Sequence, residues 1–461
     1  MKSRVRSVLH LVAVAAASLV GAHPARAQEA AAQPPAAPAS PAASARQLTM
    51  EAAIDLALSH NPQLAIEAEN IVAADAKATA DSKLRLPLLN VKANVLVWDR
   101  PIVADLGPDI GKITIRDRVT GTLDVSVAQP LSGALVIGKL VARDRAASEA
   151  SRAQRDGRRI DIAYLTAEAY LGALQAKTLG QVAQATLQQL DADLQHAKIL
   201  LQAGTLQRVD VLRLEAERAR VEQQVLQEDT TALGARRRLA MLLGLPDGTE
   251  LTLVDIDTTP PALAWAEDEA VARARRDRAD ARAAEANSHA AELGVAVTRA
   301  NYYPTVSLVG VYSHAITATF GAATDSAYLG VSLDWNLWDW GKRAAEVEGS
   351  QALSRQAHLS QVALGDQIAV DTRATWQAAR TALATLDVTA RGLAAAVEAQ
   401  RLQAARFAQG AATTVEVVDA ETALANAQSQ ATIARYQYLV AWMALSRAVG
   451  SLPEQPQARD R

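Results

Sequence analysis

The sequence contains no cysteine among its 461 residues, which excludes disulfides, cysteine metal sites and a lipid-modified cysteine. Methionine is scarce, and the histidines are scattered without the spacing of a metal motif. Beyond the N-terminus, no segment is long enough to span a membrane as a helix without carrying charges. If the chain enters a membrane, it must therefore do so as strands. We expect no cofactor, no metal and no enzyme activity.

Proline is missing from two long stretches, residues 131–245 and 305–452. Proline interrupts helix interiors, and both stretches are rich in good helix formers such as Ala, Leu, Gln, Glu and Arg. Each stretch therefore predicts a helical hairpin that turns at a glycine, Gly204 in the first and Gly410 in the second. A helix of seventy residues is a rod of about 105 Å. Alanines along one face favour close packing as antiparallel coiled-coil pairs.

The N-terminus has the pattern of an export signal. Lys2, Arg4 and Arg6 precede a short apolar run, and Ala25-Arg26-Ala27 fits a small-residue cleavage site. Residues 28–46 are mostly Ala, Pro, Gln and Ser, which predicts a flexible linker. The formal net charge of −3 becomes more negative when residues 1–27 are removed, so the composition speaks against nucleic-acid binding.

Much of the chain is duplicated. Residues 123–244 align with residues 329–450 at a constant shift of 206 positions, without a gap. This period is far longer than that of a solenoid repeat. It indicates a duplicated half-molecule with internal pseudo-twofold symmetry.

Four segments alternate between apolar and polar residues, which predicts strands with two different faces. The clearest are residues 119–128 and 329–336, and residues 91–98 and 305–312 are weaker versions. Apolar-out, polar-in strands of about ten residues are typical of a membrane barrel. Taken alone, each segment also fits a soluble sandwich. Four strands cannot close a barrel, and open edges are not tolerated in lipid, so we expect several copies of the chain to share one wall.

The chain resembles the TolC-like outer membrane efflux protein family over residues 47–453. No single motif is strong, but their order and spacing are similar to those of the family. Arg278-Ala279-Asp280 stands where the family has Arg-Pro-Asp. The other motifs are residues 48–53 with 61–64, Leu86-Pro87, Tyr303-Pro304, residues 336–342, 410–420 and 426–438.

This resemblance implies a mainly α fold with a small β part. Long antiparallel helical hairpins form an α-barrel, and three chains, as a homotrimer, share a 12-stranded β-barrel in the outer membrane. The implied partners are outer membrane lipid, a periplasmic adaptor protein and an inner-membrane pump, and no nucleic acid. The implied function is a passive exit duct for small molecules. The duct of type I protein secretion and a non-conducting periplasmic scaffold of helical hairpins remain as alternatives.

The expected division of the chain follows from these patterns. Residues 1–27 are a signal peptide, 28–46 a linker, 247–275 an equatorial connection and 454–461 a C-terminal tail. The first repeat, 47–246, has strands at about 88–99 and 114–129 and helices at about 62–86, 134–203 and 209–243. The second repeat, 276–453, has strands at about 304–316 and 327–337 and helices at about 276–301, 341–409 and 414–449.

The resemblance also suggests site residues. Glu416 and Asp419 match acidic positions at the periplasmic entrance of family members, where a trimer would place six carboxylates around the pore and favour cations. Thr413 and Glu416 also form a capping-box pattern, which would simply start a helix. Asp210 is the first-half counterpart of Glu416, whereas Arg213 replaces Asp419. The hairpin tips at Gly204 and Gly410 match adaptor-contact surfaces, although these glycines also serve as turns.

Two further patterns concern nucleotide binding and the position of the tryptophans. Residues 133–140 resemble a phosphate-binding loop, but Leu140 replaces the Ser or Thr that would hold the metal. A nucleotide site is therefore not expected. Tryptophans gather at the strand ends. For Trp98 we expect a place in an interfacial aromatic belt, and for Trp338 and Trp340 packing at the junction of strand and helix.

Overall fold

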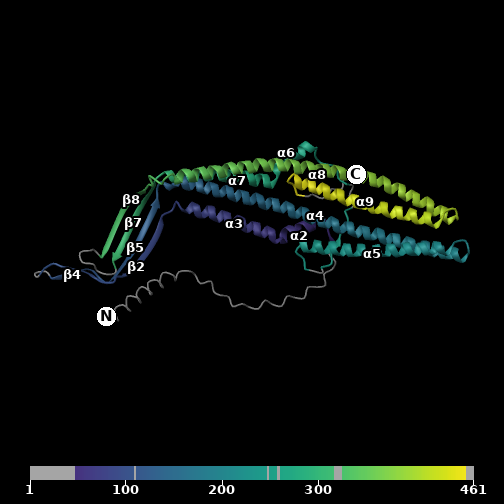
Figure 1. Ribbon diagram of the computed structural model, residues 1–461, viewed down its shortest axis with the longest axis horizontal. Helices are drawn as coiled ribbons and strands as arrows, with labels where there is room; N and C mark the ends of the chain where they lie inside the picture. Colours follow the sequence, from purple (N-terminus) through teal and green to yellow (C-terminus); the bar gives the residue numbers. More distant parts are fainter. Residues whose placement is uncertain (1–46, 108–110, 247–248, 257–259, 316–323, 453–461) are drawn as a thin grey trace, which may run out of the picture. The chain divides into compact units, whose positions relative to one another are not determined.

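The structure is a computed structural model that describes residues 47–107, 111–246, 249–256, 260–315 and 324–452. The expected signal peptide (1–27), linker (28–46) and C-terminal tail (454–461) lie outside the described residues. The fold class predicted from the sequence is confirmed: the chain is mainly helical, with a small strand region (Figure 1).

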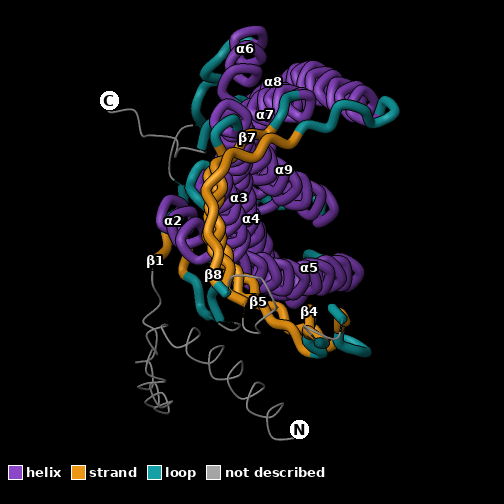
Figure 2. Tube along the Cα trace, turned by 90° about the vertical axis from the view of Figure 1, so that its left-hand side faces the viewer, coloured by secondary structure: helices purple, strands orange, loops and turns teal. Residues whose placement is uncertain are grey.

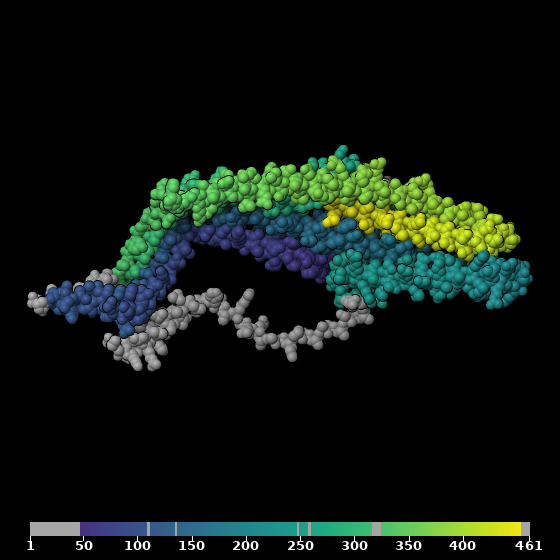
Figure 3. Space-filling model, viewed as in Figure 1, coloured from purple at the N-terminus to yellow at the C-terminus, as the bar shows by residue number. Residues whose placement is uncertain are grey.

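Two long helical hairpins dominate the chain. The first consists of α4 (Gly133–Gln202) and α5 (Arg208–Leu242), and the second of α8 (Lys342–Ala408) and α9 (Thr414–Ala448). Each pair packs along its length, and α9 also packs against α4. Figure 3 shows the two hairpins lying side by side, with α8 and α9 in green to yellow beside α4 and α5 in blue to teal.

Shorter helices complete each half. In the first half, α2 (Met50–His60) and α3 (Pro62–Lys83) lie along α4, and in the second, α6 (Glu267–Asp277) and α7 (Ala279–Arg299) contact α8. A 3₁₀ turn, η1 (Ala300–Tyr302), follows α7. The helix expected at about 276–301 is α7, and α6 occupies part of residues 247–275, which were expected as a connection. Arg278 separates the two helices: its backbone is extended, and its guanidinium holds the Asp280 carboxylate at 2.6 Å. The helix boundary persists although Ala279 lacks the ring of the family's proline.

Four strands form one antiparallel sheet in the order β2-β5-β7-β8. Their bounds are Leu88–Val97, Val119–Pro130, Thr305–Ala315 and Asp325–Asp334, and they form a curved layer (Figure 2, orange). A separate hairpin, β3 (Ile102–Asp105) with β4 (Lys112–Arg116), occupies part of the expected loop. The strand expected from about 114 therefore begins at Val119. The cause is local, since the β-branched run from Ile113 to Ile115 pairs with β3 instead.

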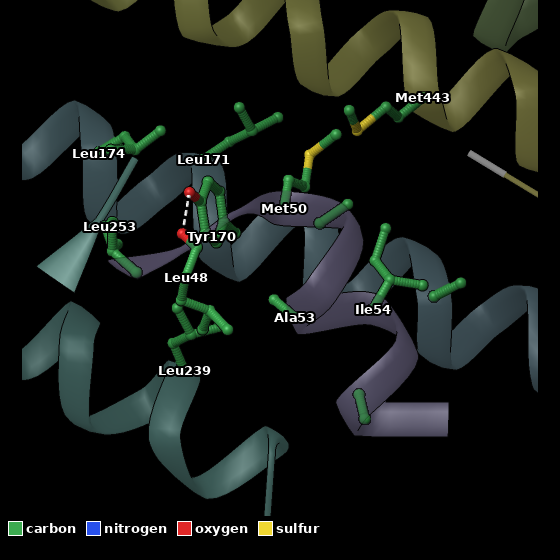
Figure 4. Packing of buried hydrophobic residues seen from close by; sticks show 14 of the residues in the cluster. Leu48, Met50, Ala53, Ile54, Tyr170, Leu171, Leu174, Leu239, Leu253 and Met443 are labelled. Carbon is green, nitrogen blue, oxygen red and sulfur yellow. Dashed lines mark hydrogen bonds between the residues drawn. The ribbon is translucent and has the colours of Figure 1, made fainter. Parts of the chain in front are cut away.

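The largest hydrophobic core lies where α2, α4, α5 and α9 meet a two-stranded parallel ribbon of β1 (Gln47–Leu48) and β6 (Thr252–Leu253) (Figure 4). The alanines at 163, 167 and 173 on α4 are fully buried there and allow the close approach expected from the sequence. Tyr170 is also fully buried, and its hydroxyl lies 2.7 Å from the carbonyl oxygens of both Leu48 and Val254. This side chain fixes the ribbon to α4.

Tyr170→Phe should lower the free energy of unfolding by about 1–3 kcal/mol, because the Val254 carbonyl then loses its buried partner. Burial raises the pKa of Tyr170 to about 12, so this effect should be constant over the neutral pH range. Thermal unfolding in detergent, followed by circular dichroism, measures it. Tyr328→Phe, at an exposed position on β8, is the control and should leave stability unchanged. Equal effects of the two variants would contradict the role of the buried hydroxyl.

Candidate functional site

The four-stranded sheet has one apolar and one polar face, as its alternating sequence predicted. The register places Val91, Val125 and Tyr312 side by side on one face. Ser126 and Asn90 lie opposite each other on the other face. The apolar side chains of the first face are Leu89, Val91, Val95, Val97, Leu123, Val125, Val127, Leu308, Tyr312, Leu329, Val331 and Leu333; Gln129, His314 and Asp325 lie on the same face. The second face is mainly polar and carries Asn90, Lys92, Asn94, Thr122, Asp124, Ser126, Ser307, Ser313, Ser326 and Ser332, together with Leu88, Leu96, Val309, Val311 and Tyr328.

No described part of the chain covers the apolar face. Leu329 is 76% exposed and Val331 68% exposed, although both are large aliphatic side chains. An apolar surface that spans all four strands is unusual for a soluble monomer and marks a lipid or protein contact. The polar face carries hydrogen bonds between strands, such as that from the Ser313 hydroxyl to the Asp124 carboxylate.

The sheet also has two open edges. β2 pairs only with β5, and β8 pairs only with β7, among the described strands. The outer backbone N–H and C=O groups of β2 and β8 thus have no strand partner within the described chain. Such edges require a partner, all the more in lipid, where water cannot satisfy them.

Two of the tryptophans near the strand ends differ from expectation, and the interfacial position expected for Trp98 stays a prediction. Trp338 and Trp340 stack edge-to-face, yet they are 73% and 89% exposed, so the packing expected for them at the junction is not formed within the described chain. Trp98 is half-buried: its indole N–H donates to the Thr120 hydroxyl at 2.9 Å, and the Arg116 guanidinium lies 3.6 Å from its ring centroid.

Both hairpins turn at the predicted glycines. Gly204 and Gly410 have φ angles of 76° and 69°, a left-handed conformation that favours glycine. In each turn the next N–H reaches back to a helix carbonyl, Thr205 to Leu200 at 3.0 Å and Ala411 to Arg406 at 2.8 Å. This is the C-terminal closure expected of such helices. Both tips are exposed.

Glu416 forms the capping box that its sequence predicted. The backbone N–H of Thr413 donates to its carboxylate at 2.7 Å, and the Glu416 N–H donates to the Thr413 hydroxyl at 3.4 Å. The first of these bonds is the main reason that the pKa of Glu416 lies below its ordinary value. Glu416 therefore carries a negative charge at neutral pH while its carboxylate stabilises the start of α9.

Asp419 lies one turn further along the same helix and is exposed. It forms no ion pair or hydrogen bond with any residue that the structure describes. Asp210 lies in the first turn of α5, and its carboxylate is 3.8 Å from the Arg213 guanidinium. No described hydrogen bond or ion pair joins Asp210 to Glu416 or Asp419. Near the tips, α9 thus carries two acidic charges with Arg406 of α8 near Glu416, whereas α5 carries the paired Asp210 and Arg213.

One acidic residue near the same tip was missed. Glu421, two residues beyond Asp419, is only 6% exposed, and its carboxylate oxygens have no hydrogen-bond partner among the described residues. The duplication offered a signal for it: Glu421 aligns with Glu215, but the lysine that accompanies Glu215 is replaced by alanine in the second half.

Comparison with known proteins matches this architecture. A family model described as outer membrane efflux protein matches residues 53–245 and 270–451, which covers both repeats. The chain belongs to the outer membrane efflux protein family. A search of curated proteins found no match.

Solved structures of outer membrane proteins have the same fold. The outer-membrane channel OprN is 22% identical, with a TM-score of 0.74 over 87% of this chain and 90% of its own. The outer membrane protein VceC from Vibrio cholerae is 19% identical, with a TM-score of 0.71 over 88% and 97%. The open state of the MtrE channel of Neisseria gonorrhoeae is 19% identical, with a TM-score of 0.72 over 88% and 90%.

Within the described residues, no helix combines the length and apolar character needed to cross a membrane. A search of the same residues for clusters of at least three His, Cys, Asp or Glu side chains able to hold a metal ion finds none.

Thr413→Ala should cost the start of α9 about 1 kcal/mol, because it removes the side-chain cap. Amide hydrogen exchange of the first turn of α9 measures the loss. Gln207→Ala is the matched control: Gln207 precedes α5 at the equivalent position and makes no side-chain capping bond. Because the pKa of Glu416 is lowered in the folded state, its bond to the Thr413 backbone contributes above the ordinary pKa of a glutamate and is lost as pH falls through the lowered pKa. Equal exchange in the two variants would contradict the cap.

Proposed function

We propose that this chain forms a passive exit duct of the outer membrane as a homotrimer, working with an inner-membrane pump and a periplasmic adaptor protein. Three chains, each with four strands, would close a 12-stranded barrel. The helical hairpins would continue the barrel as a tunnel into the periplasm. The duct exports small molecules and performs no chemistry of its own.

The observation that carries this proposal is the sheet with an uncovered apolar face and two open edges. An apolar face is stable against lipid, and the polar face then lines an aqueous interior. Each open edge of one chain would pair with an open edge of the next, which satisfies the backbone groups that lipid cannot. Pairing between copies of the chain would therefore satisfy the open edges and leave the apolar face in contact with lipid.

The helices support the tunnel. A continuous helix of 70 residues such as α4 measures about 105 Å, which far exceeds the thickness of a bilayer. It leaves the sheet at β5 and reaches the exposed turn at Gly204. An adaptor would meet the tips at Gly204 and Gly410, the parts of the hairpins farthest along the chain from the strands.

The acidic groups of α9 would face the tunnel entrance. Asp419 has no cationic neighbour in the described chain, and Glu416 is charged, so three copies would gather negative charge there and favour cations. Asp210 would contribute less because Arg213 offsets it.

The alternatives are separated by specific observations. A periplasmic scaffold of helical hairpins would expose the apolar face of the sheet to water, which is unfavourable. Extraction tests this directly: a barrel requires detergent and migrates at three times the chain mass, whereas a scaffold is released by salt as a monomer. A duct for type I protein secretion shares the same architecture, so it stands as a variant of the proposal that differs only in cargo.

Placing a charge on the apolar face should prevent insertion. Val331→Arg should destabilise the folded barrel by about 2–4 kcal/mol, the cost of an arginine near the middle of a bilayer. Ser332→Arg, one residue away on the polar face, is the matched control and should insert normally. Folding into lipid vesicles, measured as the fraction of heat-resistant trimer, compares them. If Val331→Arg inserts as well as Ser332→Arg, the apolar face does not contact lipid.

Charge at the entrance should set ion selectivity. Asp419→Asn should move the cation-to-anion permeability ratio towards unity in planar bilayers. Arg213→Asp, which recreates the second acidic pair, should move it in the opposite direction. Asp387→Asn on α8, far from the tips in sequence, serves as the control. Unchanged selectivity in both entrance variants would exclude the acidic ring.

A further inference from the structure

A buried carboxyl group without a partner lies close to the hairpin tips. Glu421 occupies the second turn of α9, and its side chain is enclosed although α9 begins only at Thr414. Neither carboxylate oxygen is hydrogen-bonded to a described residue, and both are shielded from solvent. An ionised carboxylate is costly in such a place unless a cation accompanies it.

The duplicated half shows how this cost is normally avoided. Glu215, the residue of α5 that aligns with Glu421, is exposed and lies 3.7 Å from the ammonium group of Lys198 on α4. The position that aligns with Lys198 is Ala404 on α8. In the second hairpin the acid, Glu421, is buried, and Ala404 stands where the first hairpin has the cation Lys198.

The groups around Glu421 supply no replacement cation. From α4 it meets Asp193, which itself accepts a bond from the Gln189 amide at 3.2 Å. From α8 it meets the neutral side chain of Gln400. On its own helix, Asp419 is the nearest charge, and it is also acidic.

The charges of α5 lie across a small cavity that Glu421 helps to line. Its volume of about 20 Å³ is enough for roughly one water molecule. Glu217 and Arg220 line it too, but the Arg220 guanidinium is bound to the Glu217 carboxylate, at 2.9 Å from its nitrogen Nε. Glu217 also accepts a bond from the Thr422 hydroxyl at 3.5 Å. The one basic side chain that lines this cavity is thus already paired.

A proton is the cation that fits this space. Two causes raise the pKa of Glu421 to about 9: burial is the larger, and the neighbouring Asp193 carboxylate is the second. A protonated glutamic acid can donate a hydrogen bond to a neighbouring carboxylate, and two acids that share a proton attract each other where two anions would repel.

We propose that protonated Glu421 donates a hydrogen bond to Asp193 and so holds α9 of one hairpin against α4 of the other, close to the tips. Loss of this proton leaves a buried negative charge on Glu421 beside the half-buried carboxylate of Asp193 and drives the two hairpins apart. The Glu421–Asp193 pair is therefore a proton-controlled contact between the hairpins. The inference rests on the proposed function only in its consequence for the duct, where separated hairpins would widen the entrance.

The first test is the pH dependence of stability. The folded chain holds the Glu421 proton more tightly than the unfolded chain does, so wild-type stability should fall as pH rises from the ordinary pKa of glutamate towards about 9. Glu421→Gln carries an amide at every pH and escapes this loss. Its melting temperature should exceed that of the wild type by a margin that grows between pH 5 and pH 9.

Two further variants make this test specific. Glu215→Gln, at the aligned position in the first repeat, should show no such growing margin, because Glu215 is exposed and beside Lys198. Asp193→Asn removes the neighbouring charge and should shift the fall in stability to lower pH. A margin for Glu421→Gln that does not change with pH would overturn the proposal, as would an equal margin for Glu215→Gln.

The second test measures the hairpin separation itself and needs no channel activity. Because the chain lacks cysteine, residues Thr205 and Ala411 at the two tips can be replaced by unique cysteines and spin-labelled. With labelled chains diluted in unlabelled ones, the distance should lengthen from pH 7 to pH 10 in the wild type. It should stay short in Glu421→Gln.

The outcomes of this second test are distinct. The same pH response in Glu421→Gln as in the wild type would overturn the proposal. A distance that responds to added K⁺ or Mg²⁺ at constant pH, but not to pH, would show a cation site instead and would also overturn it. A pH-dependent distance without any bilayer conductance would support the Glu421–Asp193 contact while refuting the proposed duct.

Discussion

The arrangement of this protein depends on the unpaired backbone groups at the outer edges of β2 and β8. Among the described residues these strands have a partner on one side only, and the sheet that they bound leaves an apolar face uncovered. An apolar surface is stable in contact with lipid, whereas open strand edges are not, because lipid cannot hydrogen-bond their backbone groups. The two demands are compatible only when copies of the chain join edge to edge. In the proposed trimer, that closure gives a role to the curvature of the sheet, the length of the helices and the position of the tips.

The internal duplication makes the two halves informative about each other. The two hairpins turn and end alike, since the left-handed Gly204 and Gly244 align with the left-handed Gly410 and Gly450. They differ in charged and polar partners: Gln207 stands where Thr413 caps a helix, Arg213 where Asp419 is exposed, and Lys198 where Ala404 leaves Glu421 without a cation. All three differences lie near the tips. The half that ends in α9 has gathered acidic character there, while the half that ends in α5 has neutralised it.

The sequence was sufficient for the features that depend on local pattern. The absence of proline and the glycines at 204 and 410 predicted both hairpins, and alternation predicted the four strands and their faces. The capping box at Thr413 could be predicted from the sequence because helix geometry fixes the spacing of its two residues. The family resemblance contributed the trimer and the partners, which no local pattern contains.

Other features depend on which side chains meet across the fold. Helix α6 was missed within the expected connection 247–275, because it is short and packs on α8. The β3–β4 hairpin was read as a loop because its strands are short. The burial of Glu421 arises from the packing of α9 against α4 and α8, so composition alone could not distinguish it from an exposed acid such as Asp419.

The unbroken course of α4 also constrains how this molecule can change over evolutionary time. Each residue inserted into or deleted from a continuous helix rotates everything beyond it by about 100°. Because α4 touches α2, α3, α5, α7 and α9 in succession, such a rotation would misalign several contacts at once. We therefore expect insertions and deletions to be tolerated in the connections rather than within α4, and residues 123–244 indeed align with 329–450 without a gap. The long helices can therefore accept substitutions, but a change in their length would disrupt the packing.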